Sequence, residues 1–318
     1  MRKDWSRRRF LAMTATVAAV AACSSHKPGE VAKDGSVTVK HTFGETKVPA
    51  PPKRVVSAGL TEQDDLLAVG VVPIAVTNWW GDQPFGVWPW AAPKLGDARP
   101  EVLDLSNGIQ IDRIAALKPD LIVATNAGVD QDTYAKLSAI APTIPQSGQD
   151  AFFEPWKEQA AAISQAVFKF EDMSGLVKKV EDTFTEIGKA HPQFTGRTAL
   201  LLEGAIVGDA VQVLTPGWRN EFLTQMGLTV PDTGGSVIAP DRMEQVLDAA
   251  DVLIWATENE DQQAALLADP TIAKLRATTA QRHVFTGKDL AGAIAFASPL
   301  SYPLVADQLT PSLAKVLG

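Results

Sequence analysis

The sequence predicts an α/β fold of two lobes, each built on a central parallel sheet, joined by a helical segment. One observation is a pair of similar stretches, Ile114–Thr125 and Val246–Thr257, each reading as a helix, an aspartate, a buried strand and an Ala-Thr ending. Such an internal repeat suggests two units of like architecture. A second observation is that residues 155–190, which lie between them, show helical apolar spacing and no strand pattern. This segment is therefore predicted to connect the lobes.

Apolar runs separated by turn residues predict the first lobe as alternating strands and helices. Residues 36–41 alternate as an edge strand does, and the proline-rich run 47–53 predicts an extended connector. Thr61 is placed to cap a helix that Gly70 ends. The other predicted elements of this lobe are strands at 54–58, 71–76, 121–124 and from 143, and helices at 112–117 and 132–140.

Helical spacing continues through the connecting segment. Pro155 begins one helical stretch, and a second helix is predicted from about 171 to 190, where Pro192 follows closely. The α/β pattern then resumes, with strands at 199–202, 251–255 and 284–285 and helices at 220–226, 244–249 and 302–316. The predicted divisions are a signal segment 1–22, a flexible tether 23–35, a first lobe 36–154, an interlobe helical segment 155–191 and a second lobe 192–318.

The N-terminal residues predict where the chain goes. Arg7 and Arg8 precede the apolar run 11–22, an order typical of the twin-arginine export route. This run is shorter than the roughly 20 residues that a membrane span needs, so it predicts a signal sequence. Cys23 follows directly and resembles the acylated cysteine of bacterial lipoproteins. The alternative is a basic amphipathic tail with a buried cysteine.

The charge balance and the cysteine content exclude several classes of protein. The chain has 29 basic and 37 acidic side chains; without residues 1–22, which hold five basic residues and one acidic residue, 24 and 36 remain and the net charge is −12. Binding to nucleic acid or docking on anionic lipid needs basic patches, so both are unexpected. Because Cys23 is the only cysteine, the rest of the chain has no disulfide and no thiolate metal site.

An aromatic-rich loop follows the predicted strand 71–76. Five rings interrupted by glycine and proline fall within it, namely Trp79, Trp80, Phe85, Trp88 and Trp90. Their spacing fits neither a helix nor a strand. Loops at the carboxyl ends of parallel strands line binding crevices, so the rings predict a site for a flat or bulky ligand. Trp79, Trp80 and Trp88 are predicted to face the ligand and Trp90 to be core. The alternative is that the rings pack the loop onto its own lobe.

Side chains near other predicted strands extend this site. Thr61, Glu203 and Thr257 each follow a strand and are candidates for polar contacts with a ligand, while Phe153 is a candidate for a further ring. Trp218 precedes a helix of the second lobe and is placed to close on the ligand from the other side. For each of them, the alternative is a purely structural role.

Several short motifs together are similar to one family. They are Lys53–Ser57, Thr61–Asp64, Gly81–Pro84 with Trp88–Trp90, Ile114–Ile122 and Pro299–Ser301. With these motifs the chain resembles, over residues 36–318, the iron–siderophore substrate-binding lipoproteins of ABC importers, above all their actinobacterial and mycobacterial members. The resemblance implies the class III periplasmic binding protein fold, with a rigid interlobe helix and a ligand cleft between the lobes. It also implies a monomer that hands its ligand to a membrane permease.

The resemblance implies roles for further side chains. A ferric siderophore is the expected cargo, and Arg219, with Lys288 as a second cation, is expected to pair with an anionic ferric chelate. Glu244 resembles the acidic residue by which such proteins dock on arginines of the permease, with Asp130 or Asp132 as a further docking point. The alternatives are a solvated charge for Arg219 and ordinary helix capping for the two aspartates.

The sequence lacks the motifs of the common enzyme classes, including the nucleophile elbow, the phosphate loop and the metalloprotease motif. Its four histidines are too scattered for a metal cage, and its two tyrosines are too few for free ferric iron. Haem or a corrinoid is the first alternative cargo. Haem would take Tyr302 or His283 as its axial ligand, or would bind against the tryptophans without an axial protein ligand. An envelope hydrolase using Glu203 and Asp209 is the alternative enzyme, and a lipoprotein partner without a small ligand is the third.

Overall fold

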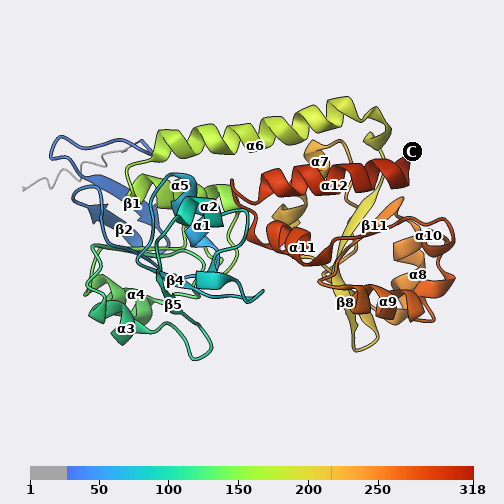
Figure 1. Cartoon of the computed structure of the whole chain (residues 1–318), viewed down its shortest axis with the longest axis horizontal. Helices are drawn as coiled ribbons and strands as arrows, with labels where there is room; N and C mark the ends of the chain where they lie inside the picture. The colour runs from blue at the N-terminus through green and yellow to red at the C-terminus, as the bar shows by residue number, and fades with distance from the viewer. Residues whose placement is uncertain (1–26, 216) are drawn as a thin grey trace, which may run out of the picture.

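Two lobes lie side by side, and one long helix runs along both of them (Figure 1). The computed structural model describes residues 27–215 and 217–318, so the predicted signal segment and Cys23 lie outside the described residues. Across the described ranges, none of the helices combines the length and the apolar character that crossing a membrane requires. The predicted architecture of two α/β lobes with a connecting helix is confirmed.

The first lobe is built on a five-stranded parallel sheet with the order β5-β4-β3-β6-β7. Every residue of β3 and β6 is buried, and β6 is a continuous apolar run, because in a parallel sheet both faces are covered. The strands are β3 (Val55–Ser57), β4 (Ala75–Thr77), β5 (Glu101–Leu103), β6 (Leu121–Ala124) and β7 (Thr143–Pro145). The helices are α1 (Glu62–Ala68), α2 (Ala92–Leu95), α3 (Ile111–Ala116) and α4 (Gln131–Ser138). Strand β5 and helix α2 are not among the predicted elements.

An antiparallel hairpin of β1 (Val37–His41) and β2 (Gly44–Val48) packs beside this sheet. Its inward side chains Val37, Val39 and Val48 join the core of the first lobe. Strand β2 overlaps the start of the predicted connector, because the first proline comes only after Val48.

The second lobe holds a mixed five-stranded sheet with the order β10-β9-β8-β11-β12. Strands β8, β11 and β12 form the predicted parallel part, and β9 and β10 extend it as antiparallel strands. The strands are β8 (Ala199–Val207), β9 (Ala210–Val213), β10 (Val237–Ile238), β11 (Val252–Ala256) and β12 (His283–Phe285). The helices are α7 (Glu221–Gln225), α8 (Pro240–Asp248), α9 (Glu260–Ala268), α10 (Arg276–Thr279), α11 (Gly287–Phe296) and α12 (Tyr302–Leu317).

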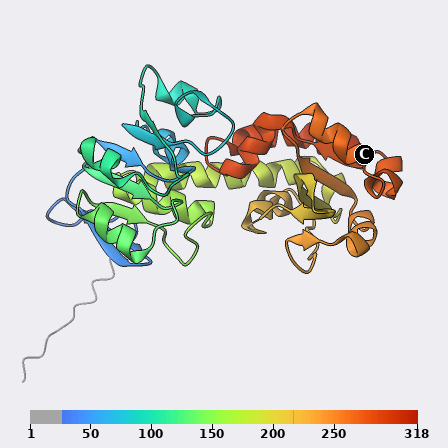
Figure 2. The same ribbon diagram turned by 90° about the horizontal axis from the view of Figure 1, so that it is seen from below.

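The predicted interlobe segment contains two helices with different roles. Helix α5 (Trp156–Ala166) packs into the first lobe, where Ile163 joins the core. Helix α6 (Phe170–Ala190) makes the connection, and its Val180 and Phe184 reach the core of the second lobe. Figure 2 shows α6 spanning both lobes from the perpendicular direction.

A second crossing joins the lobes between α11 and α12. Leu300 packs against the first-lobe cluster that contains Leu67 and Val87. Ser298 Oγ donates a hydrogen bond of 2.6 Å to Asp64 Oδ2 on α1. Helix α12 then returns to the second lobe and packs against α6. The segment between α11 and α12 thus fastens the second lobe to the first.

Candidate functional site

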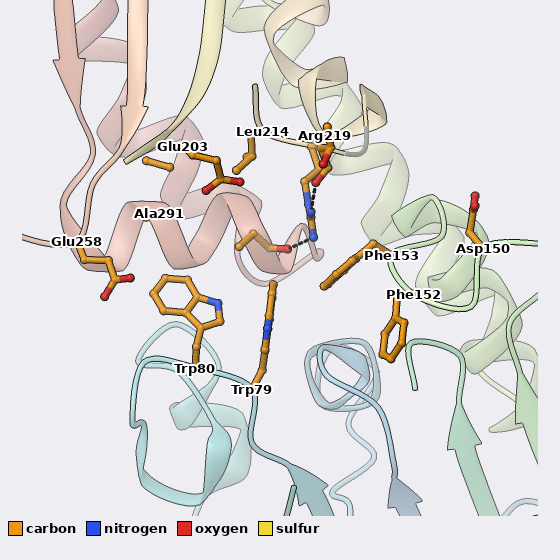
Figure 3. Close-up of a pocket in the computed structure, with 13 residues that line it drawn as sticks. Trp79, Trp80, Asp150, Phe152, Phe153, Glu203, Leu214, Arg219, Glu258 and Ala291 are labelled. Carbon is orange, nitrogen blue, oxygen red and sulfur yellow. Dashed lines mark hydrogen bonds between the residues drawn. The ribbon is translucent and has the colours of Figure 1, made fainter. Parts of the chain in front are cut away.

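A cavity of about 490 Å³ lies between the two lobes (Figure 3). The first lobe contributes the loops that follow β4 and β7. The second lobe contributes β8, the residues after β9 and β11, the short helix η3 (Gly217–Asn220) and α11. The lining residues are Trp79, Trp80, Asp150, Phe152, Phe153, Glu203, Leu214, Thr215, Arg219, Ala256, Glu258, Ala291 and Ala295. Most of them stand at or just after strand ends, where open α/β sheets form their binding crevices.

Aromatic rings form the first-lobe wall of this cavity. The centroid of the Trp79 ring lies 5.1 Å from that of Phe153 and 6.1 Å from that of Trp80. On its other side Trp79 meets Phe296 of α11, at 5.7 Å between centroids. Phe153 has a φ of 57°, in the left-handed region that a residue with a Cβ rarely adopts. Such strain is kept where the surrounding structure fixes a side chain in a particular place.

Arg219 forms the opposite wall and is already engaged by the protein. Its guanidinium donates to the backbone oxygens of Thr215 and Ala295, the latter at 2.9 Å. Its Cζ lies 4.5 Å from the centroid of the Phe153 ring, which is a cation–π contact between the lobes. Burial lowers the pKa of Arg219 to about 10, opposed by Tyr302 and Glu203, so the side chain stays charged at neutral pH.

Trp218 also links the lobes. Its indole Nε1 donates a hydrogen bond of 3.0 Å to the backbone oxygen of Phe153. The ring lines a second cavity of about 10 Å³ that adjoins the large one and includes Thr61. Trp218 therefore reaches across the gap between the lobes, but its ring contacts the first lobe and does not line the large cavity, and its contact with a ligand stays a prediction.

A family model described as a periplasmic binding protein matches residues 55–290. The chain belongs to the periplasmic binding protein family. A solved structure of a periplasmic solute binding protein from Mycobacterium smegmatis is similar to it, with 64% sequence identity and a TM-score of 0.88, over 90% of this chain and all of that one. As a member of this family, the protein binds a solute and is not an enzyme.

More distant proteins are similar as well. The probable siderophore-binding lipoprotein YfiY of Bacillus subtilis is 27% identical over 269 residues, which make up 79% of this chain and 78% of YfiY. The structure of PiaA from Streptococcus pneumoniae in complex with ferrichrome has a TM-score of 0.71 and 22% identity, over 88% of this chain and 98% of that one. At this identity the second likeness shows the shared fold alone.

Trp88 and Trp90 do not line the cavity of the binding protein. Trp88, predicted to face the ligand, is 1% exposed and stacks on Trp90 with 4.8 Å between centroids. The reason is the close approach of α11, whose Gly292 leaves room for the Trp88 ring. Trp90 packs partly buried, and its Nε1 donates a bond of 2.7 Å to Asp64 Oδ2. Phe85 likewise lies outside the cavity, beneath the Arg99 guanidinium.

Three further candidates for ligand contact are absent from the large cavity. Thr61 is buried and accepts hydrogen bonds from Asn126 and Gln159 within the first lobe. Thr257 is buried beneath the start of α11 and accepts from the Thr286 hydroxyl through its backbone oxygen. Lys288 stands in the first turn of α11, outside the lining residues. The rule that residues following parallel strands line the binding crevice, here the strand-end rule, identifies the right edge of each sheet. It does not give the direction of each side chain.

The predicted docking residues are exposed on separate lobes. Glu244 lies on α8 of the second lobe. Asp130 is the N-cap of α4, where its Oδ1 accepts from the Thr133 backbone nitrogen at 2.8 Å, and this bond lowers the pKa of Asp130. Asp132 follows in the first turn of α4. The capping role predicted as the alternative for Asp130 is present, and it leaves the side chain at the surface.

Neither candidate axial ligand for haem reaches the cavity. Tyr302 is buried in the second-lobe core against Trp156 and Phe184, and burial raises the pKa of its hydroxyl. Both ring nitrogens of His283 are engaged, Nδ1 by the Trp255 indole at 2.9 Å and Nε2 by the Thr278 hydroxyl at 2.9 Å. The prediction that either side chain ligates haem iron is therefore wrong for this conformation.

The acid pair proposed for an envelope hydrolase is also separated. Glu203 lines the cavity, and burial raises its pKa against the opposing charge of Arg219. Asp209 lies in the exposed turn between β8 and β9, with a φ of 63°. The two carboxylates share no pocket, so they cannot act as a catalytic pair.

The first turn of α1 holds three acids, Glu62, Asp64 and Asp65. In the structure Glu62 is fully buried and accepts from the backbone nitrogens of Gly59 at 2.8 Å and Asn126 at 2.9 Å. These nitrogens belong to the loops that follow β3 and β6, so Glu62 fastens the two central strand ends together. Burial raises the pKa of Glu62 to about 7, although these hydrogen bonds lower it.

Several lining residues are not among the sequence candidates. Asp150 and Phe152 follow β7, and Glu258 follows β11, so the strand-end rule would have found them. Ala291 and Ala295 come from α11, for which the sequence offers no distinctive signal, because small apolar residues are common in many elements. Their short side chains allow the wall of the second lobe to approach Trp79 and Trp80.

Proposed function

We propose that this periplasmic binding protein captures a ferric siderophore in the interlobe cavity and delivers it to the permease of an ABC importer. The observation that carries the proposal is the cavity itself, which joins two lobes and sets Trp79, Trp80 and Phe153 against an engaged Arg219. Such a wall suits a bulky chelate with apolar arms. The relatives support it, since YfiY is named as siderophore-binding and the PiaA structure contains ferrichrome. In the described residues no group of side chains is suited to hold a bare metal ion.

Titration of the intrinsic tryptophan fluorescence tests this function. Ferric siderophores of several chelating classes and haem are added separately to the purified protein. A ferric siderophore in the cavity is expected to quench Trp79 and Trp80, which line it. A shift of the haem Soret band without quenching by any ferric siderophore would overturn the proposal in favour of a haem-binding protein.

Trp79→Ala is expected to weaken binding of the cargo by about 1–3 kcal/mol, since it removes a large ring from the cavity wall. Isothermal titration of the cargo that quenches fluorescence measures this change. Phe85→Ala is the matched control, because Phe85 is in the same loop but outside the cavity. Equal affinities of Trp79→Ala and the unmodified protein would mean that the cargo binds elsewhere.

Glu244→Arg is expected to leave cargo affinity unchanged and to reduce uptake by cells severalfold, because it reverses a charge that we propose to meet an arginine of the permease. Uptake of the iron-labelled cargo by a strain lacking the unmodified protein measures the effect. Asp307→Arg on α12 makes the same charge change on an exposed residue elsewhere and serves as the control. Normal uptake with Glu244→Arg would remove Glu244 from the docking surface.

We further propose that the chain is exported by the twin-arginine route and anchored by a lipid on Cys23. Both proposals concern residues outside the described ranges. The order of Arg7, Arg8, an apolar run and Cys23 supports this, as does the naming of YfiY as a lipoprotein. Cys23→Ser is expected to move the protein from the membrane fraction to the soluble fraction of the native host. Retention in the membrane fraction would contradict the anchor.

A further inference from the structure

The charges that line the interlobe cavity are unbalanced. Three acidic residues, Asp150, Glu203 and Glu258, line it, and Arg219 is the basic residue among the described lining residues. The acids come from three places in the fold, namely the loop after β7, strand β8 and the loop after β11. In Figure 3 Asp150 and Glu258 flank the cavity on two sides, and Glu203 lies above it.

Arg219 offers little of its charge to a ligand. It is 5% exposed, it donates to two backbone oxygens, and the Phe153 ring covers its guanidinium. Glu203 is the cavity acid whose charge acts on Arg219. A bidentate grip on a ligand carboxylate would require the arginine to give up contacts that it already makes. This arrangement favours a ligand that does not depend on an ion pair with Arg219.

Asp150 and Glu258 are left without a compensating cation. Both side chains are exposed, and within the described part of the chain neither forms an ion pair. Residues 23–318 carry a net charge of −12, and clefts lined by one sign of charge concentrate the field of the whole protein. An anionic solute is therefore repelled both at long range and inside the cavity.

We propose that this cavity selects ferric chelates that are neutral or positively charged and discriminates against anionic ones. The proposal rests on the ferric-siderophore function and names the chemical class of its cargo. Three hydroxamate groups cancel the charge of Fe³⁺, whereas catecholate and citrate chelates of Fe³⁺ keep a negative charge. A trihydroxamate chelate, with or without a free ammonium arm, therefore fits the charges of this cavity. Trp80 and Glu258 both line the cavity, and an aromatic ring and a carboxylate are the groups that an ammonium arm would contact.

A matched series of chelates tests the proposal. Ferrioxamine B has a free ammonium arm; its N-acetyl derivative is neutral and its N-succinyl derivative is anionic, while the iron-binding groups stay the same. Ferric citrate, a ferric triscatecholate and haem complete the panel. The cationic form is expected to bind at least about tenfold more tightly than the anionic form at low salt. The ratio is expected to shrink as ionic strength rises, because salt screens charges near solvent.

Charge-neutral variants assign the effect to the cavity. The double variant Asp150→Asn, Glu258→Gln is expected to bring the affinity ratio of cationic to anionic ferrioxamine at least about threefold closer to one. The control double variant, Glu171→Gln with Asp307→Asn, removes the same charge from exposed positions on α6 and α12 and is expected to keep the ratio. Circular dichroism confirms that each variant is folded.

The panel distinguishes a failure of the charge selection from a failure of the siderophore function. Binding of an anionic chelate as tightly as the cationic one, or a ratio that the cavity variant leaves unchanged, overturns the charge selection while the siderophore function stands. Preferred binding of ferric citrate or the triscatecholate does the same. Binding of haem alone, or of no ferric chelate, overturns the siderophore function and the charge selection with it.

Discussion

Trp88→Ala is expected to lower the free energy of unfolding by about 3–5 kcal/mol. The Trp88 ring is 1% exposed and stacks on Trp90, and its other faces meet Trp80 at 5.1 Å and Phe296 at 5.9 Å between centroids. Truncation removes the buried apolar area of the ring and leaves a void that its rigid aromatic neighbours cannot fill. Urea denaturation followed by far-ultraviolet circular dichroism measures the loss.

The expected loss of stability is large because the Trp88 ring packs between its own loop and α11 of the second lobe. A Cβ on Gly292 of α11 would lie 2.6 Å from the Trp88 ring, so the indole fills the space that this glycine leaves open. Gly292→Ala is accordingly expected to destabilise the protein by about 1–3 kcal/mol through overpacking. The control is Trp80→Ala, which removes a partly exposed ring of the cavity wall and is expected to cost less. A loss below about 1 kcal/mol for Trp88→Ala would show that the lobes do not depend on this contact.

The central strands of both lobes are the elements that the sequence predicts best. Strands β6 and β11 are continuous apolar runs and β3 begins with two valines, because parallel strands covered on both faces require apolar side chains. Strand β10 has two residues, which is too short for any periodicity. Helix α11 begins with a glycine and is rich in alanine, and its packing against Trp88 and α12 is a tertiary effect. No local pattern could have revealed it.

The candidate site also contains residues that the sequence predicts and others that only tertiary packing determines. The strand-end rule directs attention to Trp79, Trp80, Phe153 and Glu203, all of which line the cavity, although their contact with a ligand stays a prediction. The rule fails inside the aromatic loop, because an irregular loop has no period that fixes which ring points inward. It also gives no sign that the acids of α1 are buried, since a helix that begins with acids normally exposes them to solvent.

Asp65→Asn is expected to gain stability relative to the unmodified protein as the pH rises from 5 to 8. Asp65 is 1% exposed, and its Oδ2 accepts a hydrogen bond of 2.8 Å from the Gln159 side-chain nitrogen. Burial, together with the charges of Asp64, Glu62 and Glu154, raises the pKa of Asp65 well above its ordinary value. The folded protein therefore keeps a proton on Asp65 at pH values where the unfolded chain has lost it.

The sign of the effect follows from this proton. A group whose pKa is raised by folding stabilises the fold fully below its unfolded pKa, and that contribution is lost as the pH rises through the folded pKa. Asparagine has no proton to lose, so the variant does not share this loss. The prediction concerns the difference between two proteins, because His283, whose pKa burial lowers to about 4, titrates identically in both and cancels.

Urea denaturation of both proteins at pH 5 and pH 8 measures this difference. Asp112→Asn is the matched control, since Asp112 is an exposed aspartate in the first turn of α3 on the same lobe, and its effect is expected to be similar at both pH values. An advantage of Asp65→Asn that does not change with pH would mean that the folded protein holds no extra proton on Asp65. Asp65 would then be ionised in the folded protein, and the hydrogen bond that it accepts from Gln159 would outweigh the effect of its burial.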